Sequence, residues 1–370
     1  MKLKTTLFLF VMAFVMASCG DDDDDSTAVL DIPTEYSSDS YEANVIAESL
    51  VLAELATMTS AANDAEENAQ GATEVAAIPY PPTLASVTLT TYRELVEDWL
   101  VELVNSANDD DGFQNPGPDN TPAMGEEGGL LGDRLLDENG LELEQMVQKG
   151  SFGAALYNHA LDVIQNEDLT DPGTIDRLVE IHGTSPAFDP DETTAAATYS
   201  RRRSRQSTET GAFYDIRTAL ITARAAIEGG SAFDAERDQA LDDYLLAWEK
   251  SNFATVIYYC QAANDQISAG TAMQDGDMKD EALGDAMHAY AEGVGFAHGF
   301  KGLADKQISD AQIDQILALL RAPEGQVPES YQFLNDATLL EDLQDIIDLV
   351  QNIYDFTDAE VTSFFVNDPQ

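Results

Sequence analysis

The chain has 370 residues, 44% of them hydrophobic, and carries 69 acidic residues against 18 lysines and arginines, a formal net charge of −51. The hydrophobic fraction is large enough for a packed core, so the composition predicts a globular chain with an acidic surface rather than a disordered one. The charge excludes nucleic acid as a partner, because phosphate backbones are bound by lysine and arginine. Only seven lysines occur, which favours adaptation to salty water, where screening makes an acidic surface tolerable.

Residues 1–18 have the pattern of a secretory signal peptide. Lys2 and Lys4 precede the apolar run LFLFVMAFVM, and the small residues Ala17 and Ser18 follow it. An apolar run of about ten residues is too short to span a membrane, which takes roughly 20 residues of helix. A retained transmembrane helix is therefore not expected here.

Cys19 follows this segment, and the sequence MASC resembles the bacterial lipobox, in which the cysteine becomes the lipid-bearing first residue of the mature chain. We expect the lipid to hold the protein at its membrane, because an acidic chain is repelled by anionic headgroups; a soluble secreted protein is the alternative. Residues 19–38 contain five consecutive aspartates, lack periodicity and are predicted to form a tether. With Cys19 lipidated, Cys260 has no disulfide partner and is predicted to be a small buried hydrophobic residue.

Residues 39–370 show apolar residues at helical spacing, which predicts an all-α multi-helix bundle with long acidic loops. The expected helical segments are 41–62, 84–107, 141–166, 171–183, 212–230, 232–267, 275–304, 309–323 and 337–356. Strand-like alternation occurs only in SVTLTTY, residues 86–92. The helices form either one bundle or two packed bundles, and in the second case the seams are expected at 105–129 and 184–210.

The loop at 105–129 is rich in Gly, Pro, Asn and Asp, and its DDDG sequence suggests a calcium site. Placing Gly112 at the sixth position of an EF-hand loop puts Ala107 at the first position and Pro118 at the twelfth. Neither residue can supply the required side-chain oxygen, so an EF-hand is excluded. A looser cation site in this loop is the remaining alternative.

A cluster of basic residues interrupts the acidic sequence in YSRRRSRQS. Its arginines are Arg201, Arg202, Arg203 and Arg205. The simpler interpretation, which we favour, is a surface loop paired with the surrounding carboxylates. The alternative is a docking patch for an acidic partner or for phosphate, such as that of lipopolysaccharide.

The chain contains no HExxH, G-x-S-x-G, GxxxxGK[ST] or CxxC motif, which removes the common hydrolase, NTPase and zinc-site interpretations. His288 and Glu292 are four residues apart and therefore share one face of a helix. Such a pair can bind a metal ion, such as iron, zinc or calcium, or form a buried hydrogen bond within the bundle, which is the commoner outcome. Further ligands would have to come from elsewhere, and His159, Glu142 and Glu144 are candidates.

Four short motifs follow the lipobox in order: IPTEYS at 32–37, NGLELEQMVQKG at 139–150, ARAAI at 223–227 and HAYAEGVGF at 288–296. With them the chain resembles the Bacteroidetes-type lipoproteins grouped as domain of unknown function 4856, which are similar to the imelysin-like helical proteins. The resemblance implies an all-α imelysin-like fold, a place in the cell envelope and a link to iron or haem acquisition. The acidic run after Cys19 resembles the signal that sends such lipoproteins to the outer face of the outer membrane.

Imelysins carry a GxHxxE motif, and the nearest match in this chain is Gly284, His288 and Glu292. Both spacings differ, so no metal ligand is carried over from the resemblance.

The expected function is therefore that of an outer-membrane lipoprotein, exposed at the cell surface or alternatively facing the periplasm. We expect it to be a non-enzymatic binding component in the uptake of iron, haem or another metal. An outer-membrane transporter or another surface protein is the expected partner. The alternatives are an imelysin-like metallopeptidase, which the missing catalytic motifs disfavour, and a scaffold or adhesion protein without a small-molecule site.

Overall fold

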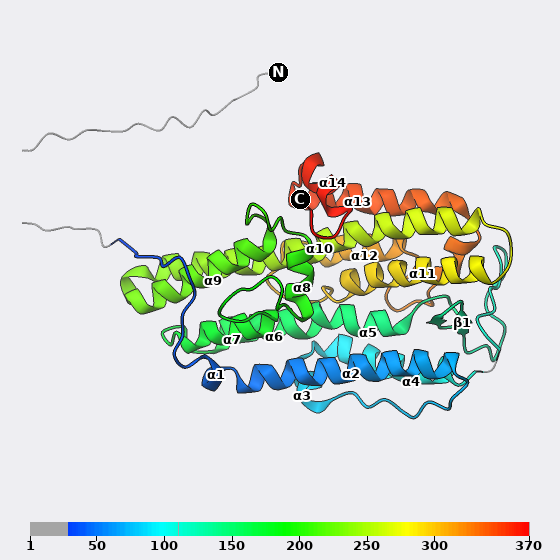
Figure 1. Ribbon diagram of the computed structural model, residues 1–370, viewed down its shortest axis with the longest axis horizontal. Helices are drawn as coiled ribbons and strands as arrows, with labels where there is room; N and C mark the ends of the chain where they lie inside the picture. The colour runs from blue at the N-terminus through cyan, green and yellow to red at the C-terminus, as the bar shows by residue number, and fades with distance from the viewer. Residues whose placement is uncertain (1–28, 110, 370) are drawn as a thin grey trace, which may run out of the picture.

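Long helices run along the longest axis of the molecule in the computed structural model, which describes residues 29–109 and 111–369 (Figure 1). The predicted signal peptide and Cys19 lie outside the described residues. Within the part that is described, none of the helices combines the length and the apolar character needed to cross a membrane.

The first half of the described chain contains seven helices, a short antiparallel hairpin and one π-helical segment. In chain order these are α1 (Tyr41–Asn44), α2 (Ile46–Gln70), α3 (Pro82–Val87), α4 (Thr90–Ala107), β1 (Gly129–Leu131), β2 (Arg134–Leu136), α5 (Leu143–Ser151), the π segment (Phe152–Tyr157), α6 (Asn158–Asn166) and α7 (Gly173–His182). The backbone stays right-handed helical from α5 through the π segment into α6, so these three form one continuous rod.

The second half is dominated by α10, which has 38 residues and is the longest helix described. Its elements are α8 (Ala195–Arg202), α9 (Ala212–Gly229), α10 (Asp234–Thr271), α11 (Asp277–His298), α12 (Asp310–Leu319), α13 (Leu340–Tyr354) and α14 (Asp358–Phe364), with three short 3-10 turns between them.

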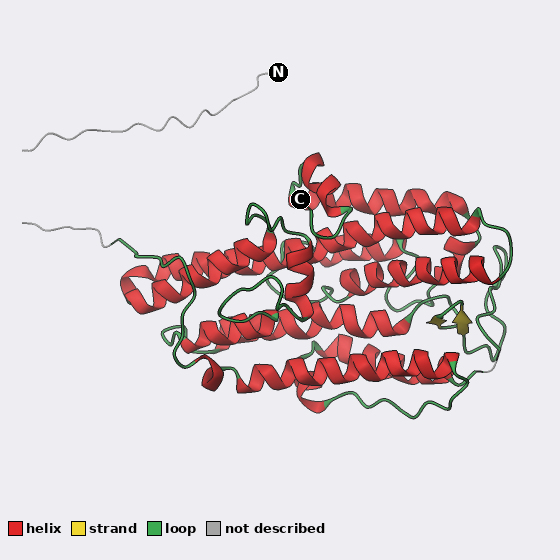
Figure 2. Cartoon of the chain, viewed as in Figure 1, coloured by secondary structure: helices red, strands yellow, loops and turns green. Residues whose placement is uncertain are grey.

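The helices stack in layers around α10 (Figures 1 and 2). Helix α10 packs against α9, α11 and α13; α11 in turn covers α5, and α4 and α2 close the far side. The buried hydrophobic residues form one continuous core from Tyr36 to Phe364. Its centre is aromatic: Trp248, Tyr157 and Tyr244 are almost fully buried, and the rings of Tyr157 and Trp248 meet edge to face.

The predicted all-α bundle is confirmed, and two helix ends show clear local signals. Ser309 begins α12 with a capping box, exchanging hydrogen bonds with Gln312. Gly183 ends α7 with a left-handed φ of 95°.

Several local expectations differ from the structure. The segment 184–210, expected as a seam, contains α8, so Arg201 and Arg202 are helical and do not lie in a surface loop. The alternating segment at 86–92 is not a strand, because Thr88 and Leu89 are an extended break between α3 and α4. The hairpin of β1 and β2 was not expected, since strands of three residues are too short to show a period.

Glycines let α11 approach α5 closely. A Cβ atom on Gly295 would lie 2.7 Å from the carbonyl oxygen of Gln145, and one on Gly299 only 2.2 Å from that of Gly150. Real Cβ atoms do not approach a backbone oxygen so closely, so these positions require glycine. The close approach brings the start of α5 against the middle of α11.

Residues 29–40 lie along the body of the molecule beside α7 and α9. Tyr36 is 7% exposed and donates a hydrogen bond of 2.6 Å to Asp176, to which Ser38 and Asn44 also donate. Arg224 of α9 completes the set of donors to this carboxylate. The described end of the predicted 19–38 tether is therefore docked on the body through Asp176.

We expect Gly299→Ala to lower the free energy of unfolding by about 2 kcal/mol or more, because the added methyl group forces α5 and α11 apart. Urea denaturation measures the change. Gly71→Ala is the control: its φ is −85° and the nearest atom to a new Cβ is 3.6 Å away, so we expect a change below about 1 kcal/mol. Equal effects of the two substitutions would show that the glycine contact is not needed.

Candidate functional site

A turn held by Asp137 places the carboxylates at the start of α5. The Asp137 carboxylate accepts the backbone N–H groups of Asn139 and Leu141, at 2.9 and 2.7 Å. This closed turn leads directly into Glu142, the residue before α5. Glu144 follows in the first turn of α5. Carboxylates are favoured there, because the helix dipole is positive at its N-terminus.

His288 of α11 meets Glu142 across the interface between α11 and α5. Its Nδ1 atom lies 2.8 Å from Oε2 and 3.0 Å from Oε1 of Glu142. On the other side of the ring, Nε2 lies 3.7 Å from Oε2 of Glu292, one turn along α11. Glu142 is fully buried, whereas a quarter of the His288 side chain is exposed. The imidazole therefore has a carboxylate at each nitrogen and one route to solvent.

Lys149 closes the buried side of this site. Its Nζ lies 3.1 Å from Oε1 of Glu292 and 5.4 Å from the centre of the Tyr199 ring. Both partners of this ion pair are less than 10% exposed, so the pair is shielded from water. We call Glu142, Glu144, Lys149, His288 and Glu292 the α5–α11 ionic cluster.

The cluster contains three carboxyl groups and two basic groups, and the pKa values respond to this imbalance. Burial raises the pKa of Glu144 to about 8, with Lys149 opposing and Glu142 adding to the rise. For His288, burial alone would lower the pKa, but the hydrogen bond to Glu142 and its charge raise it above the usual value.

Glu66 of α2 and Arg134 of β2 flank the cluster. Arg134 hydrogen-bonds Asp285 of α11 and lies 3.7 Å from Glu66. Burial raises the pKa of Glu66 to about 7, and the charge of Glu142 adds to the rise. A second carboxyl group that holds its proton near neutral pH therefore lies beside the cluster.

The structure brings His288 and Glu292 together with Glu142, but the arrangement is an ion-pair network. Within residues 29–109 and 111–369, no group of three or more His, Cys, Asp or Glu side chains is arranged to hold a metal ion. This includes the described part of the 105–129 loop. In the cluster, one ring nitrogen of His288 faces Glu142, and the Lys149 ammonium group is paired with Glu292. A metal ion bound by these side chains would have to displace the proton between His288 and Glu142 and the ammonium group of Lys149.

The remaining histidines lie elsewhere. His159 pairs with Glu48 of α2, with 3.6 Å between Nε2 and Oε1. His182 hydrogen-bonds Ser200 at 3.0 Å, and burial lowers its pKa to about 3. His298 packs against aromatic rings, and burial lowers its pKa to about 4. None of these three joins the α5–α11 ionic cluster.

Cys260 is buried in α10, and burial raises the pKa of its thiol to about 12. A thiol so far from ionisation is not a nucleophile at neutral pH. The prediction of a small buried hydrophobic residue is confirmed.

The four clustered arginines have different surroundings. Arg201 forms an ion pair with Asp368, and Arg202 stacks over the Tyr199 ring. Arg203 is 4% exposed, so its side chain is not part of a surface patch. Arg205 is half-buried in the turn that follows α8.

No protein-family model, no curated protein and no solved structure matches the chain. The resemblance to the domain of unknown function 4856 lipoproteins and to imelysin-like proteins therefore stays a prediction.

We expect Glu144→Gln to stabilise the protein at high pH only. The folded-state pKa of Glu144 is above the unfolded value, so the folded chain retains an extra proton between about pH 4.5 and 8, and its stability falls as the pH rises through this range. Glutamine removes that dependence. Urea denaturation should show a gain on the order of a few kcal/mol at pH 8.5 and almost none at pH 4.5.

The exposed Glu341→Gln is the matched control and should change stability equally at the two pH values. A gain for Glu144→Gln that is the same at both pH values would contradict the proposed burial of an ionisable carboxyl group.

Proposed function

We propose that this protein is a lipid-anchored, imelysin-like component of the bacterial cell envelope that binds a metal cation without catalysing a reaction. The α5–α11 ionic cluster is the proposed binding site, and metal or haem acquisition is the proposed role. The observation that carries the proposal is the position of His288, which has Glu142 at one ring nitrogen and Glu292 near the other.

The side-chain types of the cluster suit cation binding better than group transfer, and a bound ion would replace the Lys149 ammonium group at Glu292. Imidazole nitrogen and carboxylate oxygen are ligands for iron and zinc. Glu144 adds a third carboxyl group that holds a proton near neutral pH, and a bound cation could replace this proton. Since a quarter of the His288 side chain is exposed, an ion has a route to the cluster.

The anchor is proposed from the sequence alone. Val29 is 87% exposed, and the docked residues after it lie on the surface beside α7 and α9. A lipid at Cys19 could therefore hold the body near a membrane without any change in its core.

We expect Cys19→Ser to move the protein from the membrane fraction to the soluble fraction and to abolish incorporation of labelled palmitate, because it removes the proposed lipid attachment site. Cys260→Ser is the matched control and should remain membrane-bound. A Cys19→Ser variant that stays in the membrane fraction with its label would contradict lipidation at this residue.

We expect the purified protein to retain iron(II), zinc or calcium in equilibrium dialysis, and His288→Ala to weaken retention at least tenfold, because one ligand is lost. Metal content is measured by mass spectrometry for each ion separately. Release of protons on binding, followed in weakly buffered solution, reports displacement from Glu144 or His288.

The matched control is His159→Ala, which removes a histidine that also lies beside a buried glutamate. It should leave the metal content unchanged. Equal metal content in the wild type and His288→Ala, or an equal loss in both variants, would overturn the proposed site.

A further inference from the structure

Basic residues without an acidic partner converge on one place in this acidic chain. Of the 16 lysines and arginines in the described residues, 11 have a carboxylate oxygen within 4.0 Å. The five others are Arg93, Arg202, Arg203, Arg205 and Lys250. Three of these five, Arg203, Arg205 and Lys250, line a single pocket of about 260 Å³.

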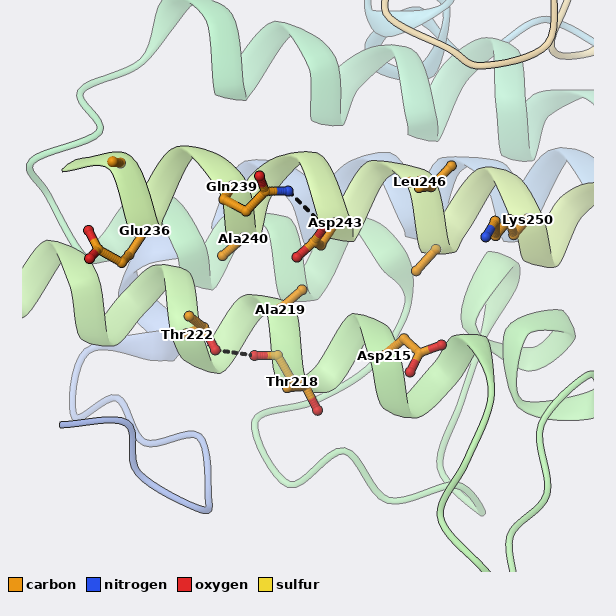
Figure 3. A pocket seen from close by; sticks show the side chains of 12 residues that line it. Asp215, Thr218, Ala219, Thr222, Glu236, Gln239, Ala240, Asp243, Leu246 and Lys250 are labelled. Atoms are coloured by element: carbon orange, nitrogen blue, oxygen red, sulfur yellow. Dashed lines mark hydrogen bonds between the residues drawn. The ribbon is translucent and has the colours of Figure 1, made fainter. Parts of the chain in front are cut away.

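The pocket lies between α10, the turn after α8 and the C-terminal helix α14. Phe356 and Phe364 give it an apolar wall, and Ser251 and Ser363 contribute hydroxyl groups. It shares Lys250 with a larger groove of about 650 Å³ between α9 and α10. Figure 3 shows this groove, with small side chains such as Ala219 and Ala240 between the two helices and Lys250 at one end.

The positive charge of Arg203 is held in place by neutral groups. Its guanidinium donates to the carbonyl oxygen of Phe364 and to the side chain of Asn367, and it lies 4.3 Å from the centre of the Tyr258 ring. Its Nε atom is buried and has no hydrogen-bond partner among the described residues. Burial lowers the pKa of Arg203 to about 10, so the group remains charged near neutral pH.

Lys250 and Arg205 are free to meet a ligand. Across the residues that the structure describes, neither side chain forms a hydrogen bond or an ion pair. The backbone of Arg205 pairs with Thr210 in both directions, which fixes the turn while leaving the guanidinium unused. Both residues are half-buried and line the pocket.

The two carboxyl groups at the pocket do not neutralise these charges. Glu360 accepts hydrogen bonds from the backbone and side chain of Thr357, which cap α14. Asp215 faces Lys250 across the groove without forming an ion pair; burial raises the pKa of Asp215, and the charge of Lys250 opposes that rise. Three basic groups against two acidic ones is an excess of positive charge at the pocket itself, while Glu236 and Asp243 line the groove farther along.

We propose that the pocket and the adjoining groove bind a small amphiphilic anion. Its carboxylate or phosphate group lies between Arg205 and Lys250, with Arg203 behind it, and its apolar body lies against Phe356 and Phe364 and along α9 and α10. Unneutralised cations beside an apolar surface recognise this combination, because the charged head and the hydrophobic body are both satisfied. This site is separate from the α5–α11 ionic cluster.

Isothermal titration of the purified protein with octanoate and octyl phosphate tests the proposal, with 1-octanol and octylammonium as probes of the same length. We expect both anions to bind at least tenfold more tightly than the alcohol, and the ammonium probe not to bind. The tighter of the two anions identifies the preferred head group. Binding of 1-octanol as tight as that of the anions, or no binding of either anion, would overturn the proposal.

Arg205→Gln and Lys250→Met should each weaken anion binding at least fivefold. Both variants should fold, because neither side chain has a partner among the described residues. Arg93→Gln is the matched control, since Arg93 also lacks a carboxylate partner but does not line the pocket. An equal weakening by Arg93→Gln would show a general effect of net charge and overturn the site.

Discussion

The shortage of basic residues is the constraint on which the rest of this structure depends. A buried carboxylate must receive hydrogen bonds or lose its charge, since leaving it unsolvated costs several kcal/mol. This chain has few lysines and arginines, so some of its buried carboxylates depend on neutral donors alone. Glu249 is 1% exposed and accepts the backbone N–H groups of Gln307 and Ile308 and the hydroxyl of Tyr354. That one carboxylate joins α10 to the loop before α12 and to α13.

The α5–α11 ionic cluster combines a buried lysine with a histidine. Elsewhere the donors differ: Asp137 has two backbone N–H groups and the Asn139 amide. Glu48 and Asp176 also meet Arg177 and Arg224. At the cluster, Lys149 and His288 meet three carboxyl groups, one of which takes up a proton. The same scarcity makes the unpaired bases beside α14 conspicuous, since a chain so poor in cations leaves three of them without acidic partners around one pocket.

The longer helices were predictable because they contain their own periodicity, and α12 and α7 also have local end signals: Ser309 begins α12 and Gly183 ends α7. The pairing of His288 with Glu292 was predictable as well, because it is a property of one helix. Glu142 could be named but not placed, since 146 residues separate it from His288 and only the packing of α5 on α11 joins them. Gly295 and Gly299 make that packing possible, because a Cβ atom at either position would collide with the backbone of α5.

The features of the site that could not be predicted from the sequence depend on contacts between residues far apart in the chain. Lys149 belongs to the cluster only because Glu292 of α11 faces it across the interface. Arg203 looked like its three arginine neighbours in the sequence, yet its guanidinium is covered by the C-terminal segment around Phe364. Short features were missed for a different reason: the three-residue strands and the π segment are too brief to produce a periodic signal.

The docking of Tyr36 and Ser38 on Asp176 has a mechanical consequence. Under the proposed anchoring, tension from a membrane lipid would enter the body through these side chains and reach Asp176 in the interior of α7. Arg224 would pass the force on to α9, one of the helices packed against the long α10. A force on the anchor would thus be distributed over several helices of the bundle instead of detaching one terminal helix. Such a distribution suits a protein exposed to flow or to moving partners.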